Sequence, residues 1–265
     1  HIKQGKITEK LLDVLSIPHI VLSADMAEEK MSSDIFRLVE TSKKENCPCA
    51  IIVKSGLFEP YIKLKKETSF LGSLGREEAV GMVLDSLDGS EIVVSTTGKI
   101  SRELYESRKK RDGGSGKDFL TVGSMGHASQ IALGISHNKK DKQVYCLDGD
   151  GAVIMHMGSL ATTGWVAPHN FKHIILNNMA HESVGGQPTA AEVIDLPGIA
   201  KSCKYSFVSS VSTGEELKKT LATFKTATGP ALLEIKVGLG SRKDLGRPTE
   251  SPVENKKKFM DFVGR

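Results

Sequence analysis

The chain has 265 residues, a formal net charge of +4 and 39% hydrophobic residues, which suits one large or two small domains with a substantial core. The mild positive charge does not by itself imply binding to nucleic acid, although it suits small anionic substrates, and no apolar run approaches the roughly 20 residues of a membrane span. The four cysteines form no CxxC pair and no zinc spacing, so a reduced, cytoplasmic setting is expected.

The first 58 residues predict a small α/β segment. Helices are expected at 7–15 and 31–43, and buried strands at 19–22 and 50–53. This is too little to close a core, and it looks like the last portion of a larger domain. The chain also begins at His1 without an initiator methionine, so we expect an upstream part to be missing. The polar, lysine-rich residues 59–69 are interpreted as a linker.

From residue 70 onward strands and helices alternate. Helices are expected at 75–87, 100–110, 128–134, 152–165, 213–226 and 255–262, and a loop and helix together at 189–201. Strands are expected at 91–94, 119–122, 144–147, 171–176, 205–208 and 231–237. This alternation predicts a doubly wound parallel sheet with helices on both faces.

Three local patterns invite functional interpretations that we reject. The basic run 108–111 is typical of a solvated helix end, where cations are favoured, rather than of a nucleic-acid patch. The glycine-rich stretch 112–117 is not a P-loop, since Asp118 stands where Ser or Thr is required. Gly149-x-Gly151 is not a dinucleotide fingerprint, since its third glycine would fall at Ile154.

Two polar motifs follow neighbouring apolar runs in the middle of the chain. Strand 144–147 leads into Asp148-Gly149-Asp150-Gly151, and strand 171–176 leads into Asn177-Asn178. Both motifs fall at carboxyl ends of strands, where open α/β sheets bind ligands. The side chains of Asp150 and Asn178 offer oxygen donors for Mg²⁺ or Ca²⁺, and the helix that follows offers free N–H groups to a phosphate. The pattern predicts a metal-bridged diphosphate site, although the same residues could merely cap and turn the chain.

Gly-Asp-Gly, a gap of 25 residues (152–176) and Asn-Asn resemble the signature of thiamine-diphosphate (TPP) enzymes. The resemblance implies TPP and Mg²⁺ as cofactors. It implies that the metal is held by Asp150, Asn178 and the carbonyl oxygen of Ala180. It also implies that the diphosphate is bound by Gly149, Gly151, Ala152 and the segment Ser95, Thr96, Thr97 and Gly98. Within 123–126, the carbonyl of Gly123 would accept a hydrogen bond from the aminopyrimidine, and Met125 would wedge between the two rings of TPP.

A narrower resemblance concerns the stretches 149–159, 177–189 and 240–262. They look like the phosphonopyruvate decarboxylase family of TPP-dependent 2-oxoacid decarboxylases, whose sister family acts on sulfopyruvate. The resemblance implies decarboxylation of 3-phosphonopyruvate to phosphonoacetaldehyde and CO₂, a step of phosphonate biosynthesis. It also implies that 1–58 are the end of a pyrimidine-binding (PYR) domain and 70–265 a diphosphate-binding (PP) domain. A homo-oligomer with active sites between PYR and PP domains of neighbouring chains is expected.

One functional residue of the family is not matched. The PYR domain normally carries a glutamate that hydrogen-bonds the pyrimidine ring and activates the cofactor, and no stretch here resembles it. We therefore expect this chain alone to be inactive. Three alternatives stay open: a decarboxylase of sulfopyruvate or another 2-oxoacid, a non-catalytic TPP-binding module, and an α/β domain that binds another Mg²⁺-nucleotide.

The remaining candidates are less specific. Glu182, His181 and His127 are candidate catalytic residues. Glu182 could donate a proton or polarise the substrate carboxylate. Each histidine could donate a proton or bind the phosphonate, with a structural or surface role as the alternative. Arg242 and Arg247 are candidate substrate ligands that could grip a dianionic phosphonate, or could lie in an exposed tail. Trp165, Cys146 and His156 are interpreted as packing residues.

Overall fold

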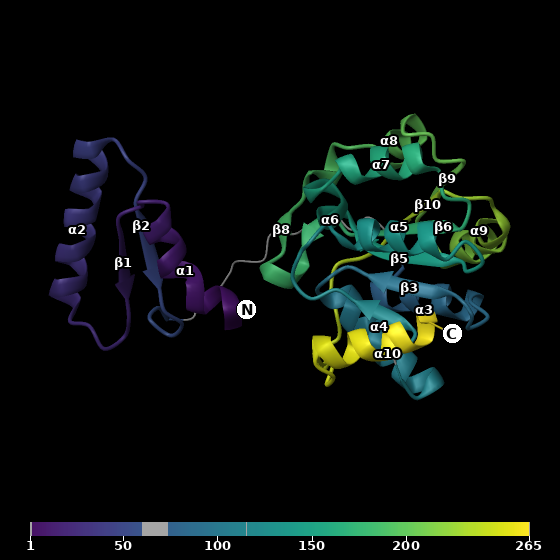
Figure 1. The fold of residues 1–265 in the computed structure, drawn as a ribbon, viewed down its shortest axis with the longest axis horizontal. Coiled ribbons are helices and arrows are strands. Elements are labelled where there is room, and N and C mark those ends of the chain that lie inside the picture. The colour runs from purple at the N-terminus through teal and green to yellow at the C-terminus, as the bar shows by residue number, and fades with distance from the viewer. Residues whose placement is uncertain (1, 60–73, 115, 265) are drawn as a thin grey trace. The chain divides into compact units, whose positions relative to one another are not determined.

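The computed structural model describes residues 2–59, 74–114 and 116–264, and the chain divides into two compact units, His1–Glu67 and Thr68–Arg265 (Figure 1). Except for Glu59, the predicted linker lies outside the described residues. Each unit is described by itself. None of the helices in the described residues is long and apolar enough to cross a membrane.

The first unit is a thin α/β layer. Its elements are α1 (Ile2–Val14), β1 (His19–Leu22), α2 (Glu28–Glu45) and β2 (Ala50–Val53). The strands pair in parallel and have the bounds that the sequence predicted, whereas both helices are longer than predicted. Among the described residues of this unit only Leu22 and Leu38 are buried. The expected shortage of core is therefore confirmed, whereas the expectation that both strands are buried was wrong, because too few apolar side chains of this unit cover them.

The second unit is built on a six-stranded parallel sheet with the order β4-β3-β5-β6-β10-β9 (Figure 1). The strands are β3 (Ile92–Ser95), β4 (Asp118–Leu120), β5 (Val144–Gly149), β6 (Phe171–Asn177), β9 (Phe207–Val211) and β10 (Ala231–Lys236). Every residue of β6 is buried, because β6 has a strand on either side and helices over both faces.

Helices cover both faces of this sheet, which confirms the predicted doubly wound fold. One apolar core contains side chains of α3 (Arg76–Ser86), α4 (Lys99–Asp112) and α9 (Gly214–Thr226). The core on the other face contains side chains of α5 (Ala128–Asn138), α6 (Asp150–Met155), α7 (Gly158–Val166), α8 (Leu196–Ser202) and α10 (Pro252–Gly264).

The strand order changes direction at β3. The chain places β4 on one side of β3 and then returns to place β5 on the other side. In doubly wound sheets the crevice at such a reversal, outside the carboxyl ends of the strands, is where ligands bind. The segments that follow β3 and β5 are therefore brought to one place by the topology.

One predicted helix was wrong in outline. The helix expected at 152–165 is two helices, α6 and α7, separated at His156 and Met157. The loop and helix expected at 189–201 are a segment with a short 3₁₀ turn (Ala190–Glu192) followed by α8, which begins where Pro197 suits the first turn of a helix and Asp195 caps that turn. A small antiparallel pair, β7 (Ala180–His181) and β8 (Gln187–Pro188), was not predicted.

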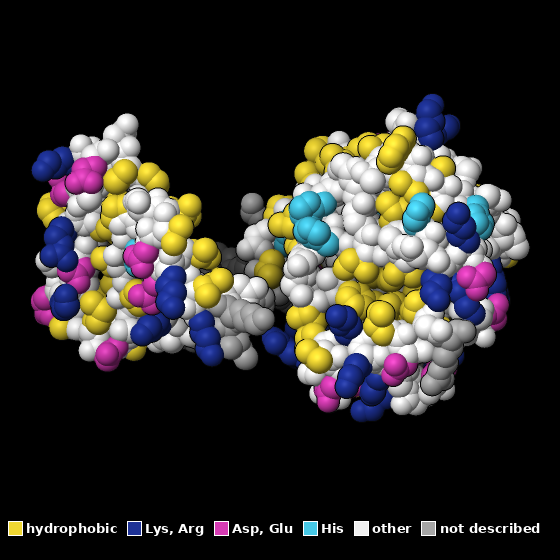
Figure 2. All heavy atoms as spheres, viewed as in Figure 1, with side chains coloured by type: hydrophobic (Ala, Val, Ile, Leu, Met, Phe, Trp, Pro, Cys, Tyr) yellow, Lys and Arg dark blue, Asp and Glu magenta, His cyan; other side chains and the backbone are white. Residues whose placement is uncertain are grey.

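The basic run at the end of α4 is partly neutralised by acidic neighbours. Arg108, expected to be solvated, is buried and pairs with Asp118 at 3.1 Å, and Arg111 pairs with Asp85 at 2.9 Å. On the face drawn in Figure 2, basic and acidic side chains lie among one another on both units.

Candidate active site

The segment that follows β3 enters α4 through a glycine whose backbone conformation would be strained for any other residue. Gly98 has φ +105°, and a Cβ atom there would lie 2.7 Å from Oγ of Ser183, so a side chain at this position is excluded. Ser101 Oγ donates to the Thr96 carbonyl at 2.6 Å. The Oγ1 atom of Thr96 is buried and has no hydrogen-bond partner among the described residues. A buried polar group left unpaired costs about 1–3 kcal/mol, so this hydroxyl is suited to bind a ligand oxygen.

Asp150 stands at the carboxyl end of β5, as the first residue of α6, and is 2% exposed. The hydroxyl of Thr189 donates to its Oδ2. Burial raises the pKa of the Asp150 carboxyl above its ordinary value, against the opposing effect of hydrogen bonds from Thr189 and from backbone amides. A carboxylate held in so little water is stabilised by a cation, which fits the predicted metal ligand.

The two asparagines after β6 form a tight turn. Asn177 Oδ1 accepts from the amide of Met179 at 3.0 Å, and Asn178 Oδ1 accepts from the amide of Ala180 at 3.1 Å. Met179 has φ +54°, and Asn177 is anchored to β10 by a 2.8 Å hydrogen bond to Glu234. We call residues 177–182 the metal loop, after the metal ligands that the sequence predicts in it. It holds the side chain of Asn178 and the backbone of Ala180 in one fixed turn beside Asp150.

Glu182, at the end of the metal loop, is held by cations. Arg76 donates to its Oε2, and Lys99 donates to its Oε1 at 3.0 Å. Burial raises the pKa of the Glu182 carboxyl, but the charges of Arg76 and Lys99 and their hydrogen bonds outweigh burial and bring it below the ordinary value. The surroundings therefore favour the ionised form, which accepts protons poorly and donates none; its predicted role in proton transfer stays a prediction.

The segment 123–126 makes a compact turn beside α6. Gly123 and Gly126 have φ +72° and +86°, and a Cβ atom on Gly126 would lie 2.8 Å from the carbonyl oxygen of Ala152. Met125 is half-buried between them. The exposed ring of His127 lies 4.3 Å from that of His156 between centroids. His156, expected to pack inside, is exposed, and it ends α6 in contact with this turn.

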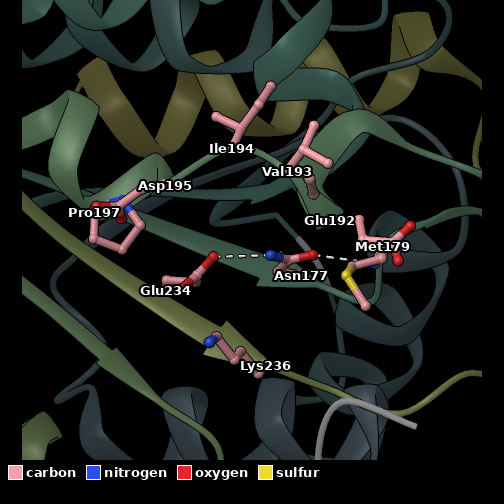
Figure 3. Close-up of a pocket in the computed structure, with 10 residues that line it drawn as sticks. Asn177, Met179, Glu192, Val193, Ile194, Asp195, Pro197, Glu234 and Lys236 are labelled. Atoms are coloured by element: carbon pink, nitrogen blue, oxygen red, sulfur yellow. Dashed lines mark hydrogen bonds between the residues drawn. The ribbon is translucent and has the colours of Figure 1, made fainter. Parts of the chain in front are cut away.

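A pocket of about 370 Å³ lies beside the metal loop, at the carboxyl ends of β6 and β10 (Figure 3). Asn177 and Glu234 point toward one another in it, and Lys236 lies at the end of β10. Three carboxylates line it, those of Glu192, Asp195 and Glu234. Neither the segment 95–98 nor 149–152 lines this pocket, so it adjoins the predicted cofactor residues without containing them.

Arg242, a predicted substrate ligand, is already occupied. Its guanidinium pairs with Glu77 at 2.9 Å, with Asp244 at 3.0 Å and with Glu106. Arg247 is exposed and forms no ion pair within the described part of the chain. Trp165, expected to pack, is 85% exposed because α7 turns it outward, so that expectation was wrong.

Beneath the site, three groups with metal-ligand chemistry lie within 4.8 Å of one another: Cys146, Asp148 and His173. All three are fully buried, and Nε2 of His173 lies 3.3 Å from Oδ2 of Asp148. Burial raises the pKa of the Cys146 thiol well above its ordinary value. Cys146 packs in the core as the sequence suggested, and the cluster links β5 to β6 under the metal loop.

Taken together, the predicted cofactor segments meet at the reversal of the sheet, and their donor set fits TPP with Mg²⁺. The fit rests on the unpaired Thr96 hydroxyl, on the carboxylate of Asp150 and on the turn that holds Asn178. Sequence reasoning missed Arg76, Lys99 and Thr189. A signal existed for Arg76, because a cation at the first position of a helix is unfavourable unless it is paired.

The sequence matches a protein family and several known proteins. Residues 96–235 match the family described as thiamine pyrophosphate enzyme, C-terminal TPP binding domain. Phosphonopyruvate decarboxylase of Streptomyces viridochromogenes is 40% identical over 188 residues, which is 71% of this chain and 46% of that one. Sulfopyruvate decarboxylase subunit beta of Methanocaldococcus jannaschii is 32% identical over 193 residues, 72% of this chain and 97% of that one.

A solved structure supports the fold. The thiamine diphosphate-dependent 4-hydroxybenzoylformate decarboxylase of Rhodococcus jostii RHA1 superposes with a TM-score of 0.54 at 18% identity, over 78% of this chain and 40% of that one. The chain belongs to the thiamine pyrophosphate enzymes and carries their C-terminal TPP-binding domain. Within them it is related to the phosphonopyruvate and sulfopyruvate decarboxylases, as the sequence predicted, and it spans under half the length of the phosphonopyruvate decarboxylases it matches.

Proposed function

We propose that this chain supplies the diphosphate-binding half of the active site of a TPP- and Mg²⁺-dependent decarboxylase that converts 3-phosphonopyruvate to phosphonoacetaldehyde and CO₂. The observation that carries the proposal is the meeting of the segments 95–98, 149–152 and 178–180 at one reversal of the sheet. The 40% identity to a phosphonopyruvate decarboxylase supports the choice of substrate.

The cofactor and the residues of this chain have distinct tasks in this proposal. Bound TPP would supply an electron sink for the bond to the departing carboxylate. Asp150, Asn178 and the Ala180 carbonyl would hold Mg²⁺, while the Thr96 hydroxyl and the first amides of α6 would bind the diphosphate. Met125, in its rigid turn, would support the bend of the cofactor.

Proton transfer is assigned among three candidates by their surroundings. Glu182 is held ionised by Arg76 and Lys99. His127 is exposed beside His156. His181 is half-buried, belongs to the metal loop and lies directly over Gly151. We therefore assign the proton-transfer role to His181 in preference to the other two.

Sulfopyruvate is the second candidate substrate. Two sulfopyruvate decarboxylase β subunits match this chain over 97% and 98% of their own length, and sulfonate, like phosphonate, is a tetrahedral anion. The same matches favour a partner that supplies the pyrimidine-binding domain, in the same or a neighbouring chain. Head-to-head turnover of the two substrates by the assembled enzyme separates the candidates. Faster use of sulfopyruvate would reverse the assignment.

Cofactor binding tests the proposal on this chain by itself. TPP together with Mg²⁺ is expected to raise its melting temperature, whereas thiamine with Mg²⁺, which lacks the diphosphate, is expected to leave it unchanged. The isolated chain is expected to show no turnover, since no match to the activating glutamate was found. A melting temperature that does not change when TPP and Mg²⁺ are added would overturn the proposal. Stabilisation by another Mg²⁺-nucleotide would indicate an α/β domain with a different ligand.

A further inference from the structure

The carboxylate of Glu182 accepts four hydrogen bonds from four separate segments. Oε2 accepts from Arg76 and from Nδ2 of Asn178, the latter at 3.0 Å. Oε1 accepts from Lys99 and from the backbone amide of Gly240, each at 3.0 Å. Two carboxylate oxygens offer about four acceptor positions in all. All of them are used, which leaves none for a metal ion.

The contact with Asn178 fixes which way that side chain points. A carboxylate only accepts hydrogen bonds, so the amide must turn its NH₂ group toward Glu182 and its oxygen away from it. The oxygen is held from the other side by the amide of Ala180 at 3.1 Å. Asn178 is 8% exposed, so bulk water has little access to compete with either contact. The orientation of this proposed metal ligand is therefore set by Glu182.

Glu182 is itself anchored in the body of the unit. Arg76 is 4% exposed and makes two further hydrogen bonds, of 2.8 and 2.7 Å, to Glu103, which is 1% exposed. Two cations, Arg76 and Lys99, face the two carboxylates of Glu103 and Glu182, so the network is neutral as a whole. A buried charge pair of this kind is rigid because breaking it would leave an uncompensated charge.

The network also connects the metal loop to the segment 95–98, which is predicted to bind the diphosphate. Lys99 is the first residue of α4 and follows directly on Gly98, the end of the segment predicted to bind the diphosphate. Its backbone amide donates to Ser183 Oγ at 3.2 Å while its ammonium donates to Glu182. Lys99, which directly follows the diphosphate segment, therefore binds both Glu182 at the end of the metal loop and Ser183 directly after it.

We propose that Glu182 is a positioning residue, which acts through Asn178 to hold the metal-binding oxygen in place and couples it to the diphosphate segment through Lys99. The inference rests on the proposed function, and it gives Glu182 a role other than the acid–base role that the sequence suggested. Partners of metal ligands typically contribute 10- to 100-fold, roughly, to metal affinity, so loss of Glu182 is expected to weaken Mg²⁺ binding by about that factor.

The test is a Mg²⁺ titration of the full chain at saturating TPP, followed by the rise in melting temperature. Glu182→Gln keeps the size of the side chain but removes two acceptor positions, and it is expected to raise the half-saturating Mg²⁺ concentration about 10- to 100-fold. The matched control is Glu106→Gln, which removes a paired carboxylate that touches Arg242 and not the metal loop. The control is expected to titrate as the wild type does.

A double-mutant cycle separates positioning from general stability. If Glu182 acts through Asn178, Glu182→Gln should add nothing to the loss of Mg²⁺ affinity in an Asn178→Ala background. Additive losses, or a half-saturating concentration within threefold of the wild type in Glu182→Gln alone, would overturn the proposal. Should Glu182→Gln fail to fold, Glu182→Asp keeps the charge but withdraws from Asn178, and the same criteria apply. Absence of any response in the wild type would instead contradict the proposed function.

Discussion

The imidazole of His181 covers Gly151. A Cβ atom on Gly151 would lie 2.7 Å from Cε1 and 2.8 Å from Nδ1 of that ring, and 3.2 Å from Cγ2 of Thr189. The second glycine of Gly-Asp-Gly is therefore required for the approach of the metal loop to α6, in addition to any ligand it binds. The motif and the loop that follows Asn-Asn form one packed unit.

Gly151→Ala is expected to push the metal loop away from Asp150. The overpacking should cost about 1–3 kcal/mol of unfolding free energy and abolish stabilisation by TPP and Mg²⁺. Differential scanning fluorimetry with and without the cofactors measures both effects.

Gly134→Ala is the control, since nothing lies within 4 Å of a Cβ atom there, and in a helix it should stabilise by about 0.5–1 kcal/mol. Adding His181→Ala to Gly151→Ala should restore part of the lost stability; no recovery would contradict the packing argument.

Asp150 is expected to make cofactor binding depend on pH. Because burial raises the pKa of its carboxyl, the acid form of Asp150 stabilises the cofactor-free fold at low pH, and this contribution is lost as pH rises through the raised pKa. Mg²⁺ needs the ionised form, so stabilisation by TPP and Mg²⁺ should be larger at pH 7.5 than at pH 5.

Asp150→Asn should abolish the response at both pH values while matching or exceeding the wild type in stability at pH 7.5 without cofactors. A retained Mg²⁺ response in this variant would exclude Asp150 as a ligand.

Lys172 is a buried cation within β6. It is 0% exposed and donates to the carbonyls of Phe224 at 2.7 Å and of Ala227, at the end of α9. Burial lowers the pKa of Lys172 to about 8 from 10.5. The unfolded chain therefore binds more protons than the folded chain between those two values, and stability due to Lys172 rises with pH in that window.

A comparison with Lys172→Met isolates this effect from other titrating groups. The difference in unfolding free energy, wild type minus variant, should grow by about 2–3 kcal/mol between pH 7 and pH 10. Chemical denaturation at several pH values measures it, and Lys219→Met, at an exposed lysine, controls for loss of a charge. A difference that shrinks with pH would mean that burial does not penalise the ammonium.

Arg242 is expected to act on stability rather than on substrate. Two of its three carboxylate partners, Glu77 and Glu106, tie the segment after β10 to α3 and α4. Arg242→Met should lower the melting temperature by a few degrees and change KM for 3-phosphonopyruvate less than twofold in the assembled enzyme. Arg247→Met, at the exposed arginine of the same tail, is the matched comparison and should leave the melting temperature unchanged. A large rise in KM with an unchanged melting temperature for Arg242→Met would restore its predicted role as a substrate ligand.

Strand bounds and helix starts could be predicted from the sequence because their signals are local. The strands 19–22 and 50–53 have the predicted bounds, since short runs of β-branched residues carry their own propensity. Thr213 and Glu216 form a capping box at the start of α9, where the helix 213–226 was predicted to begin. The Gly-Asp-Gly and Asn-Asn motifs fell at adjacent strand ends because they follow apolar runs that pair in the sheet.

The rest depended on contacts between distant residues. The break between α6 and α7 falls in a run of helix-compatible residues, and His156 at the break packs against Gly126, 30 residues earlier in the chain. Arg76 and Glu182 lie 106 positions apart, and no local pattern pairs them. The direction of individual side chains also could not be predicted from the sequence. Trp165 is exposed although tryptophan is usually buried, and Lys172 is buried although lysine is usually exposed.

The uneven burial of the two units has a consequence for amide hydrogen exchange. In the first unit, where two of the described residues are buried, the amides of β1 and β2 are expected to exchange with deuterium at rates close to those of an unfolded chain. In β6, flanked by β5 and β10, exchange should require opening of the whole second unit. Mass spectrometry of the isolated chain would then show two populations of amides with widely separated lifetimes. Slow exchange in β1 would indicate that another protein surface protects it.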